Sequence, residues 1–165
     1  DWAQRAYAHG VPMGGELLHS NDYTPPEFLL WAAKDPSSAW LQRVQIIKGW
    51  IENGAIREAV FDVGCADGLV PDPITHRCPD NGATVSLETC DYDRHKGDGQ
   101  IAARWRDPDF DPAERAFYYA RVLENPTCRW STWDSLRTRL PVSDAVPPTL
   151  QERAWTSPIW YRPQH

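Results

Sequence analysis

The sequence predicts a mainly β domain, an antiparallel sandwich-like fold with short helices and long loops. Short runs of β-branched and aromatic residues recur along the chain, and turn-forming residues separate them, as in other all-β domains. The 15 Pro residues favour turns, loops and strand edges over long helices. The 165 residues suffice for one domain with its own core, so we expect a single β-rich domain over 1–165.

The first half of the chain contains a predicted β-hairpin. Phe28–Ala33 is an apolar run that ends at an Asp-Pro pair, which predicts a buried strand. Two further apolar runs, Val44–Ile51 and Ala59–Val63, flank Asn53-Gly54. Asn-Gly is a strong signal for a two-residue hairpin turn, so these two runs are expected to pair.

The remaining elements follow from shorter patterns. Alternation and aromatic content predict strands over Thr84–Leu87, Gln100–Trp105, Phe117–Leu123 and Ser157–Tyr161. Short helices are expected over Asp1–His9, Ser131–Leu140 and Thr149–Trp155, with a single helical turn at Asp111–Glu114. Between the hairpin and the later strands, the 67–82 stretch is rich in Pro and Gly and predicts a loop.

Charge and hydropathy exclude two classes of partner. The chain has 17 Lys and Arg against 23 Asp and Glu, a net charge of −6. Nucleic acids and anionic membrane surfaces reward clustered Lys and Arg, so we expect no nucleic-acid partner. The longest apolar run, Phe28–Ala33, is far below the roughly 20 residues of a spanning helix, so we expect no membrane span.

The four cysteines, Cys65, Cys78, Cys90 and Cys128, form an even set with three conceivable pairings. No C-x-x-C motif occurs, which disfavours a zinc site, and four reduced thiols in a cytosolic protein are the other alternative. Two disulfides are the preferred interpretation, with Cys65–Cys78 and Cys90–Cys128 as one guess at the pairing. Disulfides would place the protein in the periplasm or outside the cell.

The motifs of common catalytic and metal sites fail in this sequence. The segments Asp91–Lys96 and Asp107–Pro112 imitate a calcium loop, but Lys96 and Pro112 replace the Gly that the sixth position needs. No nucleophile elbow or phosphate loop occurs, and the five His residues are scattered. We therefore assign no catalytic residue, no metal ligand and no cofactor within these 165 residues.

Trp and Arg concentrate in the last third of the chain. Arg beside Trp can hold an anionic group or stack on a sugar or a peptide. The candidate ligand-binding residues are Arg129, Trp130, Trp133, Arg153 and Trp155. The alternative for each Trp is that it fills the core, which is the more common role of large aromatic residues.

Several long strings resemble one bacterial family. They are Gly10–Gly15 (GVPMGG), Gln45–Trp50 (QIIKGW), Trp105–Asp111 (WRDPDFD), Arg115–Trp130 (RAFYYARVLENPTCRW) and Gln151–Tyr161 (QERAWTSPIWY). They are similar to the carboxy-terminal part of the family catalogued as domain of unknown function 3604. The resemblance runs from Gly10 to Tyr161, and strings of this length are far more specific than a short motif.

The resemblance implies a context for the chain. Longer members resemble metal-dependent phosphoesterases through amino-terminal segments rich in His and Asp, and many look exported. The chain starts at Asp1 rather than at Met, so we expect a carboxy-terminal fragment of a longer protein.

The function that the resemblance implies is a non-catalytic accessory domain of an exported metal-dependent hydrolase-like protein of unknown substrate. Its partner would be the amino-terminal domain of its own chain, which would hold any divalent metal. The alternative is a Trp/Arg-rich module that binds a glycan or a peptide.

Overall fold

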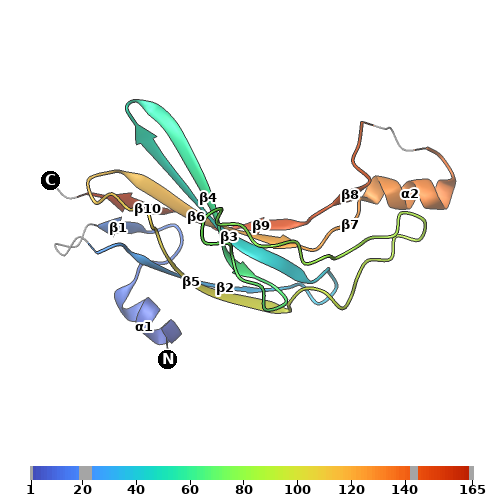
Figure 1. Cartoon of the computed structure of the whole chain (residues 1–165), viewed down its shortest axis with the longest axis horizontal. Coiled ribbons are helices and arrows are strands. Elements are labelled where there is room, and N and C mark those ends of the chain that lie inside the picture. Colours follow the sequence, from blue (N-terminus) through green and yellow to red (C-terminus); the bar gives the residue numbers. More distant parts are fainter. Residues whose placement is uncertain (1, 19–23, 142–144, 164–165) are drawn as a thin grey trace.

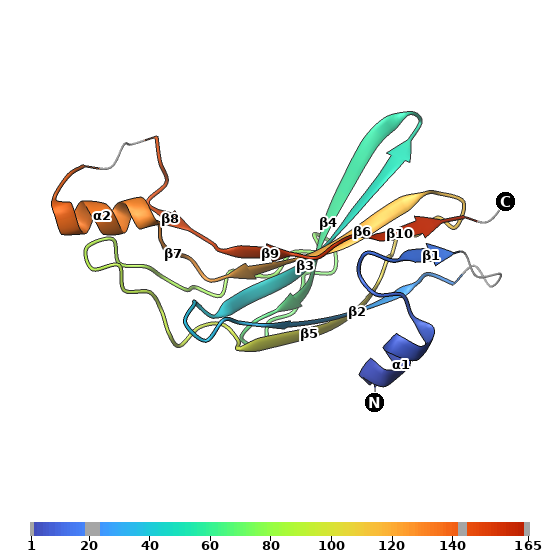
Figure 2. The same cartoon turned by 180° about the vertical axis from the view of Figure 1, so that it is seen from behind.

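The computed structural model describes residues 2–18, 24–141 and 145–163, which form a mainly β structure with two short helices (Figures 1 and 2). The main sheet has six strands in the order β1-β10-β6-β3-β4, and β9 also pairs with β6. Strands β2 and β5 form a separate pair, and β7 and β8 form another. The bounds are α1 (Trp2–His9), β1 (Glu16–Leu18), β2 (Glu27–Ala33), β3 (Leu41–Glu52), β4 (Ala55–Cys65), β5 (Gln100–Arg106), β6 (Ala116–Glu124), β7 (Thr127–Cys128), α2 (Trp130–Thr138), β8 (Thr149–Leu150), β9 (Arg153–Trp155) and β10 (Ile159–Arg162).

Strand β3 is the centre of the main sheet. It pairs antiparallel with β4 on one side and with β6 on the other. The hairpin predicted from Asn53-Gly54 is confirmed, because β3 ends at Glu52 and β4 begins at Ala55. Asn53 and Gly54 both have positive φ angles, 51° and 77°, as a tight two-residue hairpin turn requires.

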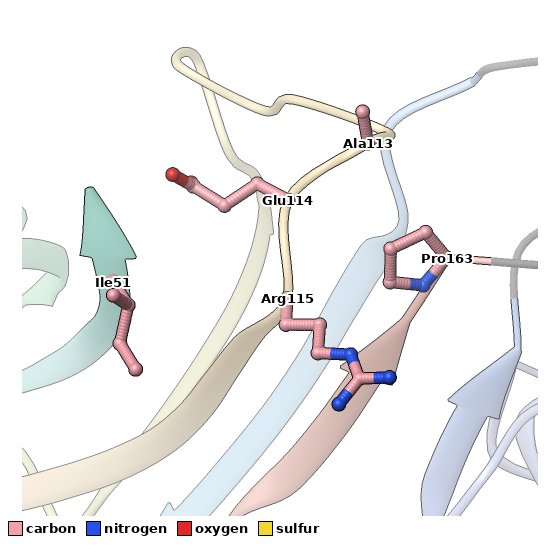
Figure 3. Close-up of a pocket in the computed structure, with 5 residues that line it drawn as sticks. All are labelled: Ile51, Ala113, Glu114, Arg115 and Pro163. Atoms are coloured by element: carbon pink, nitrogen blue, oxygen red, sulfur yellow. The ribbon is translucent and has the colours of Figure 1, made fainter. Parts of the chain in front are cut away.

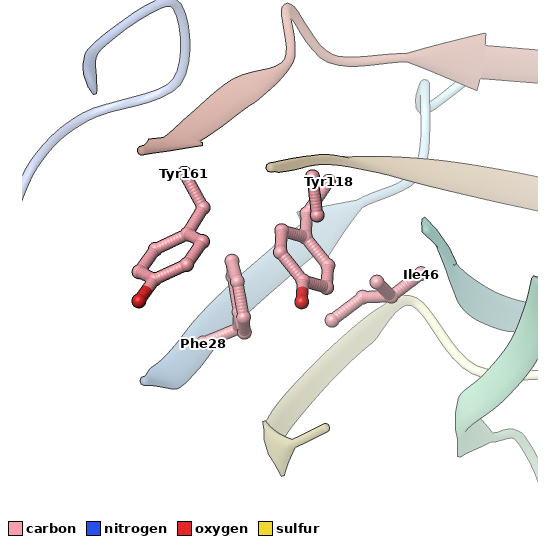
Figure 4. Packing of buried hydrophobic residues seen from close by; sticks show 5 residues of the cluster. Phe28, Ile46, Tyr118 and Tyr161 are labelled. Atoms are coloured by element: carbon pink, nitrogen blue, oxygen red, sulfur yellow. The ribbon is translucent and has the colours of Figure 1, made fainter. Parts of the chain in front are cut away.

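The β2–β5 pair packs over one face of the main sheet and closes the core between two layers. Phe28 of β2 lies against Ile46 of β3, Tyr118 of β6 and Tyr161 of β10 (Figure 4). The ring centroids of Phe28 and Tyr118 are 4.7 Å apart, a normal distance for interacting aromatic rings. This two-layer arrangement fits the sandwich-like fold expected from the sequence.

Both expected disulfides are present, and the guessed pairing is correct. Cys65 at the end of β4 is bonded to Cys78, which closes the loop between them. Cys90 is bonded to Cys128 of β7 and ties the long 83–99 segment to the end of the molecule that carries α2. Each disulfide contributes about 2–4 kcal/mol to stability in the usual range, largely by restricting the unfolded chain.

Three sequence-based expectations are wrong. The 149–155 stretch forms β8 and β9 instead of a helix, because residues 153–155 pair with the exposed edge of β6. The expected strand at Thr84–Leu87 is reduced to one bridge between Val85 and Tyr92, and Asp111–Glu114 forms a turn that is not helical. In the 149–155 stretch, tertiary pairing overrides local propensity. The antiparallel sandwich-like class itself holds, with one parallel pair, β1 and β10, at the edge of the main sheet.

The hairpin turn provides a test of the fold. A Cβ at Gly54 would have no heavy atom within 4 Å, so Gly54→Val introduces backbone strain without a steric clash with other residues. We expect the variant to lose about 1 kcal/mol or more of unfolding free energy, measured by chemical denaturation. Ala55→Val, one residue later in β4, is the matched control and should leave the midpoint nearly unchanged. An unchanged midpoint for Gly54→Val would contradict the turn geometry.

Candidate functional site

Helix α2 projects from the main sheet at the end of the molecule opposite to β1 (Figures 1 and 2). The short β7–β8 ladder carries it, and the Cys90–Cys128 disulfide fixes the base of that ladder. The backbone N–H of Arg129 and the hydroxyl of Thr132 both donate to the carbonyl of Pro148, at 2.9 and 2.7 Å. Thr132 is the buried residue of α2, so the helix is held by its first turn and contributes little to the core.

Three large apolar side chains lie on one side of this helix, and a fourth follows shortly after its end. Trp130 is 72% exposed, Trp133 39%, Leu136 39% and Leu140 67%. Within α2 these residues recur every three positions, which places them on one side of the helix. We call these four residues the apolar stripe. Scattered apolar side chains on a surface are normal, but contiguous ones mark interaction sites.

The five ligand-binding candidates do not form one cluster. Arg129, Trp130 and Trp133 stand at α2, whereas Arg153 and Trp155 lie on β9, beside β6 in the main sheet. The cation above the Trp133 ring is Arg137, 5.6 Å from the ring centroid, and not a predicted arginine. The core-filling alternative is wrong for Trp130 and Trp155, which are 72% and 59% exposed. The Arg129 Nε is buried without a hydrogen-bond partner.

A second group of functional side chains is buried between the two layers. Lys48 of β3 and Asp107, which follows β5, are 3% and 2% exposed. Their Nζ and Oδ2 atoms are 2.7 Å apart. The Tyr118 hydroxyl donates to the same Oδ2 at 2.8 Å, and Lys48 also donates to the carbonyl of Asp109 at 2.8 Å. The pair is thus fully hydrogen-bonded, as a buried charge must be.

Burial controls the acidity of the groups around this pair. It raises the pKa of Tyr118 far above its ordinary value, and the Asp107 carboxylate adds to the effect. Partial burial also raises the pKa of Glu114, whose carboxylate is 3.9 Å from the Lys48 ammonium; the positive charge offsets part of that rise. A buried tyrosine hydroxyl therefore stays a hydrogen-bond donor, and the Glu114 carboxyl holds its proton more readily than an exposed glutamate does.

Glu114 also lines an open hollow of about 350 Å³ at the surface (Figure 3). The other residues around it are Ile51, Ala113, Arg115 and Pro163. A second hollow of similar size lies on β2 and β5 and is lined by Leu29, Leu30, Ala102, Ala103 and Arg104. Both are open surface features. Among the residues that the structure describes, no three His, Cys, Asp or Glu side chains converge as metal ligands would.

The acidic segment from Asp107 to Asp111 serves local structure. The Asp107 carboxylate accepts from the N–H of Asp109, in addition to Lys48 and Tyr118. The Asp111 carboxylate accepts from the N–H of Ala113 at 2.8 Å and closes the following turn. The carboxylates of Asp107 and Asp111 therefore both have hydrogen-bond partners close by in the sequence.

Sequence reasoning missed the Lys48–Asp107 pair. The available signal was the alternation in β3, in which Val44, Ile46, Lys48 and Trp50 occupy every second position. Because alternate strand residues share one face, Lys48 had to point the same way as its apolar neighbours. A lysine on a core-facing position needs a buried acidic partner, and no pattern in the sequence identified Asp107 as that partner.

The buried pair makes a specific stability prediction. Asp107→Ala leaves the Lys48 charge inside the core without its partner, so the unfolding free energy should fall by at least about 3–5 kcal/mol. The control is Glu52→Ala, which removes an exposed pair with Arg57 and should cost less than about 1 kcal/mol. Equal losses in the two variants, measured by denaturant titration, would show that the Asp107 contact does not stabilise the core.

One of the comparisons with known proteins finds a match. The model of the family described as "Protein of unknown function (DUF3604)" matches residues 1–163. No curated protein and no solved structure matches the chain. Within the described residues, no helix is both long and apolar enough to cross a membrane. Since the family model covers nearly all 165 residues, the chain belongs to this family of proteins of unknown function.

Proposed function

We propose that this chain is a non-catalytic accessory domain of an exported, metal-dependent hydrolase-like protein. In this proposal it packs through the apolar stripe of α2 on the amino-terminal, catalytic domain of the same protein. The observation that carries the proposal is the exposure of the stripe, from 39% to 72%, on a helix that contributes little to the core. Apolar surfaces of this kind, rich in Trp, are typical of protein interfaces.

The way in which α2 is held supports a docking role. The Cys90–Cys128 disulfide and the two bonds to the Pro148 carbonyl fix the helix before any partner arrives. A rigid helix loses little conformational entropy on binding, so more of the free energy of apolar burial becomes affinity. The two disulfides are also consistent with an extracellular or periplasmic location, where such bonds persist.

Arg129 is the first candidate for contact with an anionic substrate of that catalytic domain. It stands directly before α2, next to Trp130 of the stripe, and its side chain is half-buried. Arg153 of β9, which is exposed, is the second candidate. Arginine side chains bind phosphate and carboxylate groups through two parallel hydrogen bonds, which suits the rim of a site for anions.

A second function, binding of a glycan or a peptide, is favoured by the other face of the main sheet. The Phe117 ring reaches over Gly49 of β3, where a Cβ would come within 2.2 Å of it. The Tyr119 ring is nearly parallel to the Phe117 ring, at 12°, and Trp160, 49% exposed, lies 5.5 Å from Phe117. Partly exposed rings arranged side by side can stack on sugar rings or on peptide side chains.

Docking through α2 can be tested with the separate amino-terminal part of a longer family member. We expect Trp130→Ala and Trp133→Ala each to weaken its binding to this chain by about tenfold or more, as for central interface Trp residues. The matched control is Trp31→Ala, since Trp31 is 61% exposed but belongs to β2 of the separate β2–β5 pair and not to α2. Binding can be measured by titration calorimetry.

Equal weakening by all three variants would contradict docking through α2. Unchanged binding of the two α2 variants, together with loss of glycan or peptide binding in Trp160→Ala, would instead establish the binding-module function. The folded state of each variant is checked by its denaturation midpoint.

The accessory role also makes a prediction about turnover. We expect the 165-residue chain alone to hydrolyse no phosphomonoester, phosphodiester or sulfate ester with added Zn²⁺, Mn²⁺ or Fe²⁺. Metal-assisted hydrolysis needs several convergent ligands around an open coordination position, which the proposal assigns to the amino-terminal domain. The longer protein should be active under the same conditions. Metal-dependent turnover by the chain alone that disappears in His76→Ala, His95→Ala or Asp109→Ala would overturn the accessory role.

A further inference from the structure

The buried Lys48–Asp107 contact has the composition and geometry of an amide-forming pair. We propose that the Lys48 amine and the Asp107 carboxyl condense into an intramolecular isopeptide bond after the chain folds. The two reacting groups are already in contact, with Nζ and Oδ2 2.7 Å apart. Both side chains are shielded from solvent, with 4% and 0% of their surfaces exposed. This inference is independent of the docking role of α2.

The reaction requires the uncharged forms of both groups, an amine and a carboxylic acid. Aromatic rings enclose the pair: the Lys48 Nζ lies 5.1 Å from the centroid of the Trp50 ring, and Tyr118 contacts Asp107 directly. Transfer of one proton from the ammonium to the carboxylate replaces two buried charges by a neutral amine and a neutral acid. Holding these groups in contact also removes the entropic cost of bringing them together.

Neighbouring groups are placed to assist the reaction at Asp107. The N–H of Asp109 donates to Oδ1 at 2.9 Å and would stabilise the negative charge that develops there when nitrogen attacks. The Tyr118 hydroxyl donates to Oδ2 at 2.8 Å, the oxygen that departs. Lys48 also donates to the Asp109 carbonyl at 2.8 Å, which orients its nitrogen.

Glu114 can relay the protons, because its carboxylate is 3.9 Å from Nζ. The neutral Lys48 nitrogen attacks Cγ of Asp107, and the C–N bond forms while the C=O π electrons move to Oδ1. Glu114 takes a proton from the nitrogen and returns it to the Oδ2 hydroxyl, which leaves as water while the C=O bond reforms. The ammonium and the carboxylate thus yield one amide and one water molecule, and no oxidant or further reactant is needed.

The bond would add a covalent link between the two layers of the fold. Lys48 lies in the main sheet, whereas Asp107 follows β5 of the second layer. Unlike the disulfides of Cys65 and Cys90, an amide resists reducing agents. It would close a loop from residue 48 to residue 107 and restrict the unfolded chain in the same way as a disulfide.

Mass spectrometry of the purified, denatured chain tests the proposal. We expect the intact mass to be lower than the mass calculated for the chain with two disulfides, and the difference to equal one water molecule. After complete denaturation an amine-reactive label should modify two of the three lysines, Lys34 and Lys96 but not Lys48. Proteolysis should release one branched peptide that contains both Lys48 and Asp107. A wild-type chain at its full calculated mass, with three reactive lysines, would overturn the proposal.

Three controls make the result specific. Lys96→Arg removes an exposed lysine and should keep the mass deficit, whereas Lys48→Arg should abolish it, because a guanidinium does not form this amide. Glu114→Gln preserves the Lys48–Asp107 contact but lacks the relay, so it should accumulate the unlinked chain. Full linkage in Glu114→Gln would overturn the relay.

Asp67-Gly68 and Asp98-Gly99 can also lose water, by forming cyclic imides that hydrolyse in mild alkali. A mass deficit that disappears after treatment with mild alkali would therefore overturn the isopeptide bond.

Discussion

The burial of the Lys48 amino group inside the core constrains the whole structure. Lys48 is directed inward because the alternation of β3, the central strand, leaves it on the same face as Val44 and Ile46. A buried ammonium without a partner would cost several kcal/mol, so the segment that supplies Asp107 must close over this point of the sheet. That segment follows β5, and β5 positions β2, so the second layer and its aromatic residues are aligned by the same contact.

The described residues divide into a packed body and a projecting arm. In the body, β3 and β6 bury Ile46 and Tyr118 against Phe28 of the second layer. The arm, formed by β7, β8 and α2, has little core of its own and depends on the Cys90–Cys128 disulfide. This division explains why apolar side chains remain exposed on α2. A surface that is held rigid but left apolar suits contact with another folded domain better than capture of a small molecule.

Much of the fold could be predicted because its signals are local. Asn53-Gly54 specified the hairpin, and the even set of cysteines without metal-ligand spacing indicated two disulfides, both of which are present. The candidate site was predicted less well. The sequence singled out Trp130 and Trp155 as candidate ligand-binding residues. In the structure they lie on separate elements, α2 and β9. The helix expected over 149–155 became strands because the edge of β6 offered unpaired backbone groups.

The sequence by itself determined the β-rich class, the hairpin, the disulfide content and the family of this protein. These properties depend on backbone preferences and on the spacing of neighbouring residues, which a single sequence displays. The tertiary structure decided the strand order, the parallel pairing of β1 with β10, the partner of Lys48 and the exposure of Trp130. Each of these depends on which distant segments come to lie together, and the burial of a side chain is a property of its neighbours in space.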